Sequence, residues 1–306
     1  MSTSGGTRAI IAALLANTGI AVTKFIAAAF SGSASMLAEG VHSLADAGNQ
    51  LLLLIGGRRA RRAATEEHPF GYGRSRYVYA FIVAIVLFSV GGLYSLYEGV
   101  HKIQDPHPLE IPWLPVVVLL VAIVLESFSL RTAVKESNHV RGNQTWVQFV
   151  RRAKSPELPV VLLEDIAALL GLVFALIGVS IAWVTGDGTW DGIGTLAIGV
   201  LLVAVAVILG LEMSSLLIGE GATREDMGKI RAAIEAGPEV DSIIHAKTLY
   251  LGPDELLVAA KVAMAPTTSL GDISTRINAI ESRVREAVPV ARVIYLEPDV
   301  RQPAKV

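Results

Sequence analysis

The sequence predicts a membrane protein with six transmembrane helices followed by a small α+β domain. Of its 306 residues, 52% are hydrophobic and only 18% are charged, whereas an average soluble domain carries about 25% charged residues. The scarcity of charge comes from six apolar stretches, and a helix needs about 20 residues to cross about 30 Å of hydrocarbon. The composition changes after the last stretch. We therefore expect a transmembrane domain over residues 1–218 and a second domain over residues 219–306.

Each apolar stretch is expected to be an α-helix, because lipid offers no partner for an unpaired backbone group. The predicted spans cover residues 9–30, 34–56, 77–100, 113–130, 159–184 and 188–217. The short polar start, MSTSGGTR, predicts no removable targeting segment.

Basic residues predict the orientation of these spans. They gather in the loop after the second span (Arg58, Arg59, Arg61, Arg62, Arg74 and Arg76) and in the segment after the fourth (Arg131, Lys135, Arg141, Arg151, Arg152 and Lys154). The loop after the third span has only Lys102, and the loop after the fifth has none. Because basic loops stay in the cytoplasm, both termini are expected there, with the chain in the plasma (inner) membrane.

The second domain shows the order αββαβ. Thr223 and Asp226 resemble a capping box that opens a helix. Two β-rich runs, residues 240–251 and 256–265, flank the turn sequence Gly-Pro-Asp-Glu. An amphipathic helix over residues 269–288 and a strand over residues 290–296 complete a ferredoxin-like order.

Composition also excludes several functions. The chain has 26 basic and 28 acidic residues, so no basic excess favours nucleic-acid binding. It has no cysteine, which excludes disulfides, thiolate metal sites and cysteine nucleophiles. The His-Glu-x-x-His pattern of metalloproteases is absent from the sequence. We expect no enzyme activity and no bound cofactor.

Ionisable residues inside a span are costly, about 2.5–3.5 kcal/mol each on insertion scales, and are therefore functional candidates. The second span carries Glu39, His42 and Asp46. Spacings of three and four place them on one helix face. A His and an Asp four residues apart can bind one cation, so this face is a candidate metal site.

The fifth span carries adjacent carboxylates, Glu164 and Asp165, in the run PVVLLEDIAALLGL, which contains no basic residue. A divalent cation shared with the second span would remove the cost of burying them, so these two helices are expected to face each other. Adjacent residues lie about 100° apart on a helix, so at most one of the pair points squarely at the site and the other would bond to a neighbouring helix. Two interpretations are open for Lys24, pairing with a carboxylate or snorkelling to the membrane interface, and we expect snorkelling. We expect Asp191 to cap its own helix.

Several motifs together resemble the cation diffusion facilitator family, which includes the zinc transporters. They are SGSASMLAEGVHSLADAGNQ on the second span, HPFGYGR after it, and the terminal αββαβ domain. The run VVLLEDIAALLG resembles the branch that contains a mitochondrial zinc transporter.

The resemblance implies a divalent ion bound by two residues four apart on the second helix and two on the fifth. His42 and Asp46 match the first pair, and Asp165 matches one member of the second. The other member is Val161, which cannot bind a metal. Either Glu164 or water would supply the fourth ligand.

The resemblance further implies a homodimer and additional metal sites. His68 matches a ligand in the loop after the second span, and His245 matches one in the terminal domain, where Lys261, Tyr295 and Glu297 occupy the other positions. A lysine there argues against a metal, so we expect dimerisation without a complete metal cluster. Arg74 matches a basic position that joins the two domains, with Glu220 as its candidate partner.

We expect export of a divalent metal in exchange for protons, within the lipid bilayer. The resemblance favours zinc, although one imidazole and several carboxylates also suit manganese, cobalt or iron(II). A passive cation channel, a membrane metallohydrolase and a metal sensor are the alternatives. The partly amphipathic segment 135–157 is expected to be a membrane-surface helix or a regulatory or dimer contact.

Overall fold

The structure, a computed structural model, describes residues 3–300, and the side chains of α1 at Leu14 and from Asn17 onward. The expectation that the start of the chain is not a removable targeting segment rests partly on Met1 and Ser2, which lie outside that range. The chain divides into two compact units: a helical unit that runs to Arg58 and continues over Tyr77–Ser214, and a second unit of Arg59–Arg76 with the residues from Ser215.

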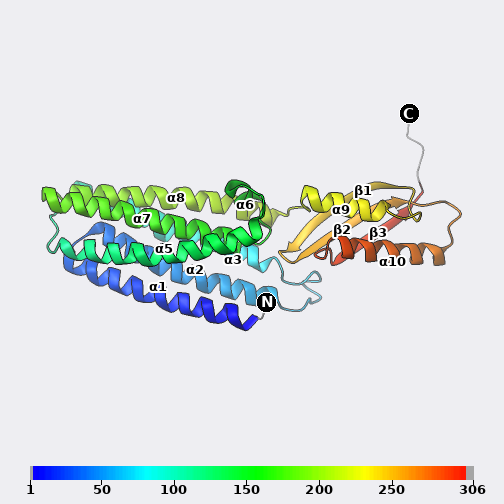
Figure 1. Ribbon diagram of the computed structural model, residues 1–306, viewed down its shortest axis with the longest axis horizontal. Coiled ribbons are helices and arrows are strands. Elements are labelled where there is room, and N and C mark those ends of the chain that lie inside the picture. The colour runs from blue at the N-terminus through cyan, green and yellow to red at the C-terminus, as the bar shows by residue number, and fades with distance from the viewer. Residues whose placement is uncertain (1–2, 301–306) are drawn as a thin grey trace, which may run out of the picture. The chain divides into compact units, whose positions relative to one another are not determined.

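The helical unit consists of long helices that run lengthwise beside one another (Figure 1). The helical elements, of which η1 and α6 are short, are α1 (Thr3–Ser31), α2 (Ala34–Ala60), α3 (Ser75–Val86), η1 (Leu87–Leu93), α4 (Tyr94–Gln104), α5 (Trp113–Arg141), α6 (Trp146–Arg152), α7 (Glu157–Thr185) and α8 (Thr189–Ile218). Among the described residues, four stretches are long and apolar enough to cross a membrane: Ser75–Gln104, Trp113–Arg141, Glu157–Thr185 and Thr189–Ile218. The helix α2 covers the second predicted span but is more polar than these four stretches. Spanning by α1 and α2 stays a prediction.

The third predicted span contains a π-helical turn that the sequence pattern did not indicate. The segment η1 joins α3 and α4 without a break and contains Gly91 and Gly92. A Cβ on Gly92 would lie 2.7 Å from Val203 Cγ2 on α8, and one on Gly99 would lie 2.7 Å from the Leu196 backbone nitrogen. These glycines let the third span pack directly on α8.

The start of α2 is held by a side chain from α8. Asp191 accepts hydrogen bonds from the backbone nitrogen of Ala34 (2.6 Å) and from the hydroxyl of Ser33 (2.9 Å). It also accepts one from the backbone nitrogen of Ser35 (3.2 Å). The expectation that Asp191 caps its own helix is therefore wrong. A carboxylate at a helix N-terminus pairs with amides that have no partner within the helix.

The second unit contains the predicted αββαβ order. Its elements are α9 (Arg224–Glu235), β1 (Ser242–Gly252), β2 (Glu255–Ala263), α10 (Leu270–Ala287) and β3 (Val293–Asp299). β2 lies centrally, antiparallel to β1 and parallel to β3. The tight turn is confirmed by the pairing of Gly252 with Glu255. Thr223 caps α9 by accepting from the Asp226 backbone nitrogen.

The core of this unit lies between the sheet and its two helices. Buried residues from α9, β2 and α10, among them Ile230, Ile234, Leu256, Val258 and Ile280, form one cluster. The last strand begins three residues later than predicted. Val290 and Ala291 instead form a turn in which the Ala291 nitrogen donates to the Val288 carbonyl.

The segment between α5 and α7 folds back on them as the short helix α6. Thr145 and Gln148 form a reciprocal capping box at its start. Phe149 is buried against Ala133 on α5 and Leu162 on α7. Trp146 and Val147 remain exposed, so α6 has an apolar face beyond that contact.

Candidate metal-binding site

The polar face of α2 forms the centre of the candidate site. His42 is buried, and its Nε2 lies 3.6 Å from Asp46 Oδ2. The helical spacing predicted this proximity. A Cβ on Gly91 of η1 would lie 3.9 Å from His42 Nδ1, so the π-helical turn packs beside the imidazole.

Several buried polar atoms along this face lack a hydrogen-bond partner among the described residues. They are Glu39 Oε1, His42 Nδ1 and Nε2, Asp46 Oδ1, Asn49 Oδ1 and Gln50 Oε1. Buried polar atoms in native proteins are nearly always satisfied, and each exception needs an explanation such as an ion. Most of these atoms are oxygen or imidazole acceptors, which suit a divalent cation.

α7 faces α2, as expected from the carboxylates on both. Asn49 Nδ2 donates to Glu164 Oε1 at 2.7 Å. Farther along, a Cβ on Gly171 would lie 2.7 Å from Glu39 Oε1. The two helices therefore approach closely at two levels, above and below His42 and Asp46 on α2.

The two carboxylates of α7 point to different helices. Glu164 is buried against Asn49 of α2, whereas Asp165 accepts a 3.1 Å hydrogen bond from Ser129 Oγ on α5. The rotation of about 100° between adjacent helical residues causes this divergence. Val161 packs with the apolar cluster around Phe149.

Lys24 pairs with a carboxylate, which was the alternative interpretation, and the preferred expectation that it snorkels is wrong. Its ammonium is buried and lies 2.9 Å from Glu39 Oε2 and 2.8 Å from Ser43 Oγ. One oxygen of Glu39 is thereby committed to an ammonium, and the other has no partner among the described residues. A buried carboxylate is costly unless paired, which explains the position of Lys24.

The structure brings only part of the candidate set together. His42 and Asp46 are adjacent, while Glu164 and Asp165 hydrogen-bond to other residues. Within the described part of the chain, no three His, Asp or Glu side chains form a group able to hold a metal. Binding by all four would require the Asn49 and Ser129 hydrogen bonds to rearrange.

The loop candidate His68 lies in the second unit. Its ring stacks on Tyr72 with 4.5 Å between centroids, and its backbone nitrogen donates to Thr65. The side chain is exposed.

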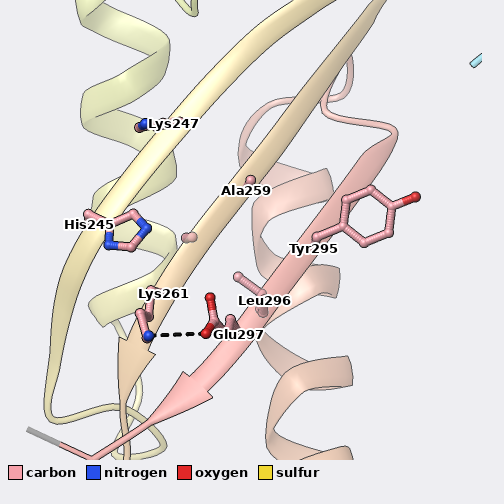
Figure 2. Close-up of a pocket in the computed structure, with 8 residues that line it drawn as sticks. His245, Lys247, Ala259, Lys261, Tyr295, Leu296 and Glu297 are labelled. Carbon is pink, nitrogen blue, oxygen red and sulfur yellow. Dashed lines mark ion pairs between the residues drawn. The ribbon is translucent and has the colours of Figure 1, made fainter.

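The terminal-domain candidates share one face of the sheet (Figure 2). His245 on β1 pairs in register with Lys261 on β2, which pairs with Glu297 on β3. The Lys261 ammonium lies 3.0 Å from Glu297 Oε1 and 2.9 Å from Asp299 Oδ2. These hydrogen bonds, first that of Asp299, raise the pKa of Lys261. The Lys261 ammonium therefore forms ion pairs with Glu297 and Asp299, the carboxylates beside His245.

Sequence reasoning missed two residues that contact the candidate carboxylates, Asn49 and Ser129. Asn49 continues the spacing of three and four that joins Glu39, His42 and Asp46, so extending that pattern by one turn would have found it. Ser129 offers no such signal, because its contact with Asp165 joins residues 36 positions apart on different helices.

Comparison with known proteins agrees with the resemblance. The family model of the cation efflux transmembrane domain matches residues 10–218. The chain is 32% identical over 242 residues to the Xenopus laevis protein named proton-coupled zinc antiporter SLC30A9, mitochondrial, covering 78% of this chain and 43% of that protein. It is 31% identical over 257 residues to metal tolerance protein C4 of Arabidopsis thaliana, covering 83% and 56%.

A bacterial protein is also similar. The cation-efflux pump FieF of Klebsiella pneumoniae is 26% identical over 250 residues, covering 82% of this chain and 78% of that protein. The chain spans less than half the length of the vertebrate relative. Since the family model covers well over half of its residues, the chain belongs to the cation efflux family.

Proposed function

We propose that this protein exports a divalent metal ion, with zinc as the favoured cargo, in exchange for protons. The unpartnered acceptors along α2, around His42 and Asp46, carry this proposal. The zinc antiporter named among its relatives supports the choice of cargo.

The metal site in this proposal lies between α2 and α7. His42 and Asp46 supply one nitrogen and one or two oxygens. Asp165 turns from Ser129 toward the ion, and Glu164 or water completes the coordination. Zinc accepts such ligands at about 2.0–2.2 Å. Manganese, cobalt and iron(II) accept the same donors, so competition among these metals measures the selectivity.

Proton exchange follows from the chemistry of the ligands. A metal binds only deprotonated carboxylate and neutral imidazole, so protonation and metal binding compete. Protons arriving from the far side of the membrane therefore release the ion. Alternating access requires α2 and α7 to move relative to the rest of the bundle. In this proposal α1 and α2 complete six spans, both termini lie in the cytoplasm, and the protein works as a homodimer in the plasma membrane.

Transport into liposomes tests the proposal. Purified protein with an imposed pH gradient should accumulate zinc, and zinc should drive proton movement in the opposite direction. Asp46→Asn and Asp165→Asn should abolish both fluxes. Asp105→Asn, in an exposed ion pair with His107, is the matched control. Wild-type transport by both site variants would contradict the site, and zinc flux without proton movement would favour a passive channel.

A further inference from the structure

The short helix α6 has two faces of different character. Phe149 is 3% exposed and packs against Ala133 of α5 and Leu162 of α7. Two residues along a helix turn the side chain by about 200°, and Val147 is accordingly 66% exposed. Arg151, one turn after Val147, shares its side of the helix and is exposed as well. α6 therefore presents an apolar and a basic side chain away from α5 and α7.

This outward side is held in a fixed conformation. A helix of seven residues does not form alone in water. Thr145 Oγ1 accepts from the Gln148 backbone nitrogen at 3.2 Å, and Gln148 Oε1 accepts from the Thr145 backbone nitrogen at 3.1 Å. With the buried Phe149, these bonds stabilise α6, so an ordered helix carries the exposed residues.

Exposed apolar side chains occur on α6 and on the end of α5. They are Trp146 and Val147 of α6 and Val140 in the last turn of α5. The Arg141 guanidinium lies 4.3 Å from the centroid of the Trp146 ring, which joins the two helices. Tryptophan beside arginine is typical of segments at the boundary between hydrocarbon and headgroups.

The surrounding segment is strongly basic. Residues 131–156 contain six basic residues (Arg131, Lys135, Arg141, Arg151, Arg152 and Lys154) and a single acidic residue, Glu136. Arg151 and Arg152 are exposed. The Arg151 Nε atom lies 3.8 Å from Glu212 Oε1, at the long end of ion-pair distances. The segment therefore keeps a clear positive excess.

The position of α6 in the chain places it near lipid headgroups. It connects α5 and α7, which are both long and apolar enough to cross a membrane, and it lies at one end of the helical unit (Figure 1). A connector between two spans begins and ends where the chain leaves the hydrocarbon. The exposed residues of α6 therefore lie at the depth of the headgroups.

Charge decides between the occupants that fit this surface. A second copy of the chain would bring the same arginines together, and like charges repel across an interface. An anionic phospholipid complements both features, because its phosphate binds guanidinium groups and its acyl region accepts apolar side chains. The anionic lipid is therefore the favoured occupant.

We propose that the α6 surface, formed by Trp146, Val147, Arg151 and Arg152, binds anionic phospholipid headgroups, and that this binding holds α7 against α5. Phe149 transmits the effect, because it contacts Leu162, which lies one turn before Asp165 on α7. The effect on transport rests on the proposed function, whereas the binding of lipid does not.

A fluorescent probe tests lipid binding directly. The chain has no cysteine, so Val147→Cys can carry an environment-sensitive fluorophore on the full chain in liposomes. The emission should shift to the blue as phosphatidylglycerol replaces phosphatidylcholine. Leu270→Cys on α10, 83% exposed, is the control and should not shift. Unchanged emission at Val147→Cys, or an equal shift at Leu270→Cys, would overturn the proposal.

A soluble headgroup separates lipid binding from simple anion binding. Glycerophosphoglycerol added to phosphatidylcholine liposomes supplies the same phosphate ester without acyl chains. It should leave the Val147→Cys emission unchanged, because Trp146 and Val147 then gain no apolar contact. An equal shift with the soluble headgroup would show a site for free phosphate esters and refute the lipid surface.

Charge variants test the two arginines. In the labelled Val147→Cys protein, Arg151→Gln/Arg152→Gln should raise the phosphatidylglycerol fraction at half-maximal shift by about fivefold or more. Arg151→Lys/Arg152→Lys keeps the charge and should stay close to the parent protein. Arg224→Gln/Arg231→Gln on α9 makes the same charge change at exposed positions and is the matched control. A parental midpoint in the α6 glutamine variant, or an equal rise in the α9 variant, would refute the role of these arginines.

Zinc transport tests the effect on α7. The cysteine-free protein should transport zinc severalfold faster in liposomes with phosphatidylglycerol than in phosphatidylcholine alone, and Arg151→Gln/Arg152→Gln should lose that difference. Equal rates in the two lipids, with the probe shift present, would refute the hold on α7. If the protein transports zinc in neither lipid, the proposed function fails, and the probe at Val147→Cys still decides lipid binding.

Discussion

The carboxylate of Asp191 on α8 accepts a 2.6 Å hydrogen bond from the backbone nitrogen of Ala34, the first residue of α2, 157 positions earlier in the chain. Asp191 also accepts from Ser33 and Ser35. The helix that carries His42 and Asp46 is therefore fixed at its start by another helix.

Replacing Asp191 should loosen that attachment. Asp191→Ala leaves buried donors at Ser33, Ala34 and Ser35 unpaired, and each unsatisfied buried group costs about 1–3 kcal/mol. Thermal unfolding of the detergent-purified protein should show a lower midpoint, with zinc transport reduced as well. Asp105→Ala removes only an exposed ion pair and should leave the midpoint almost unchanged. Equal midpoints for both variants would contradict this role.

Lys24 and Glu39 should be coupled in stability. Lys24→Met leaves a buried carboxylate without its ammonium, and breaking a buried pair in this way costs about 3–5 kcal/mol. The double variant Lys24→Met/Glu39→Gln removes the stranded charge and should recover much of the loss. A double-mutant cycle from unfolding midpoints measures the coupling. Additive effects of the two substitutions would show that the pair does not form in the membrane.

Two glycine substitutions should have opposite effects. A Cβ on Gly178 of α7 would lie 2.8 Å from the Trp190 carbonyl oxygen, whereas one on Gly48 of α2 meets nothing within 4 Å. Gly178→Ala should destabilise by about 1–3 kcal/mol through overpacking. Gly48→Ala should stabilise by about 0.5–1 kcal/mol, because alanine is the better helix former. Unfolding midpoints check both, and a harmless Gly178→Ala would mean that α7 and α8 are farther apart.

Lys261 should control metal binding on the sheet. Lys261→His removes the ammonium from Glu297 and Asp299 and adds an imidazole beside His245, a set of donors suited to zinc. Isothermal titration of the full chain should detect one additional zinc per chain. Lys247 lines the same pocket but forms no ion pair with a carboxylate among the described residues, so Lys247→His should add none. Equal stoichiometry in wild type and Lys261→His would contradict the prediction.

The ion pair of Glu239 and Arg283 should give the second unit an acid-sensitive stability. Arg283 donates to both carboxylate oxygens, at 3.0 and 3.1 Å, and lowers the pKa of Glu239 below its ordinary value of 4.5. A carboxyl whose pKa is lowered in the folded state stabilises the fold at pH values above its ordinary pKa. That stabilisation is lost as the pH falls through the folded-state pKa. Unfolding midpoints measured from pH 7 down to pH 3 should fall less for Glu239→Gln than for wild type. Parallel curves would exclude a contribution from this pair.

The candidate site was predictable where it depended on one helix. Spacings of three and four placed His42 beside Asp46, and the buried carboxylates of the fifth predicted span indicated that α7 faces α2. The order of the second unit followed from caps, turn residues and alternating apolar positions. The π-helical turn at Gly91 was not predictable, because an apolar run has the same composition in either helix type.

By itself the sequence determined which residues share a helix face, since that depends only on the helical repeat, and which stretches avoid water. The tertiary structure alone decided that Glu164 turns to Asn49, that Asp165 turns to Ser129, that Lys24 pairs with Glu39, and that Asp191 holds the start of α2. Each of these contacts joins separate helices. Their partners are set by how the helices rotate and pack against one another, and no local pattern along the chain encodes that packing.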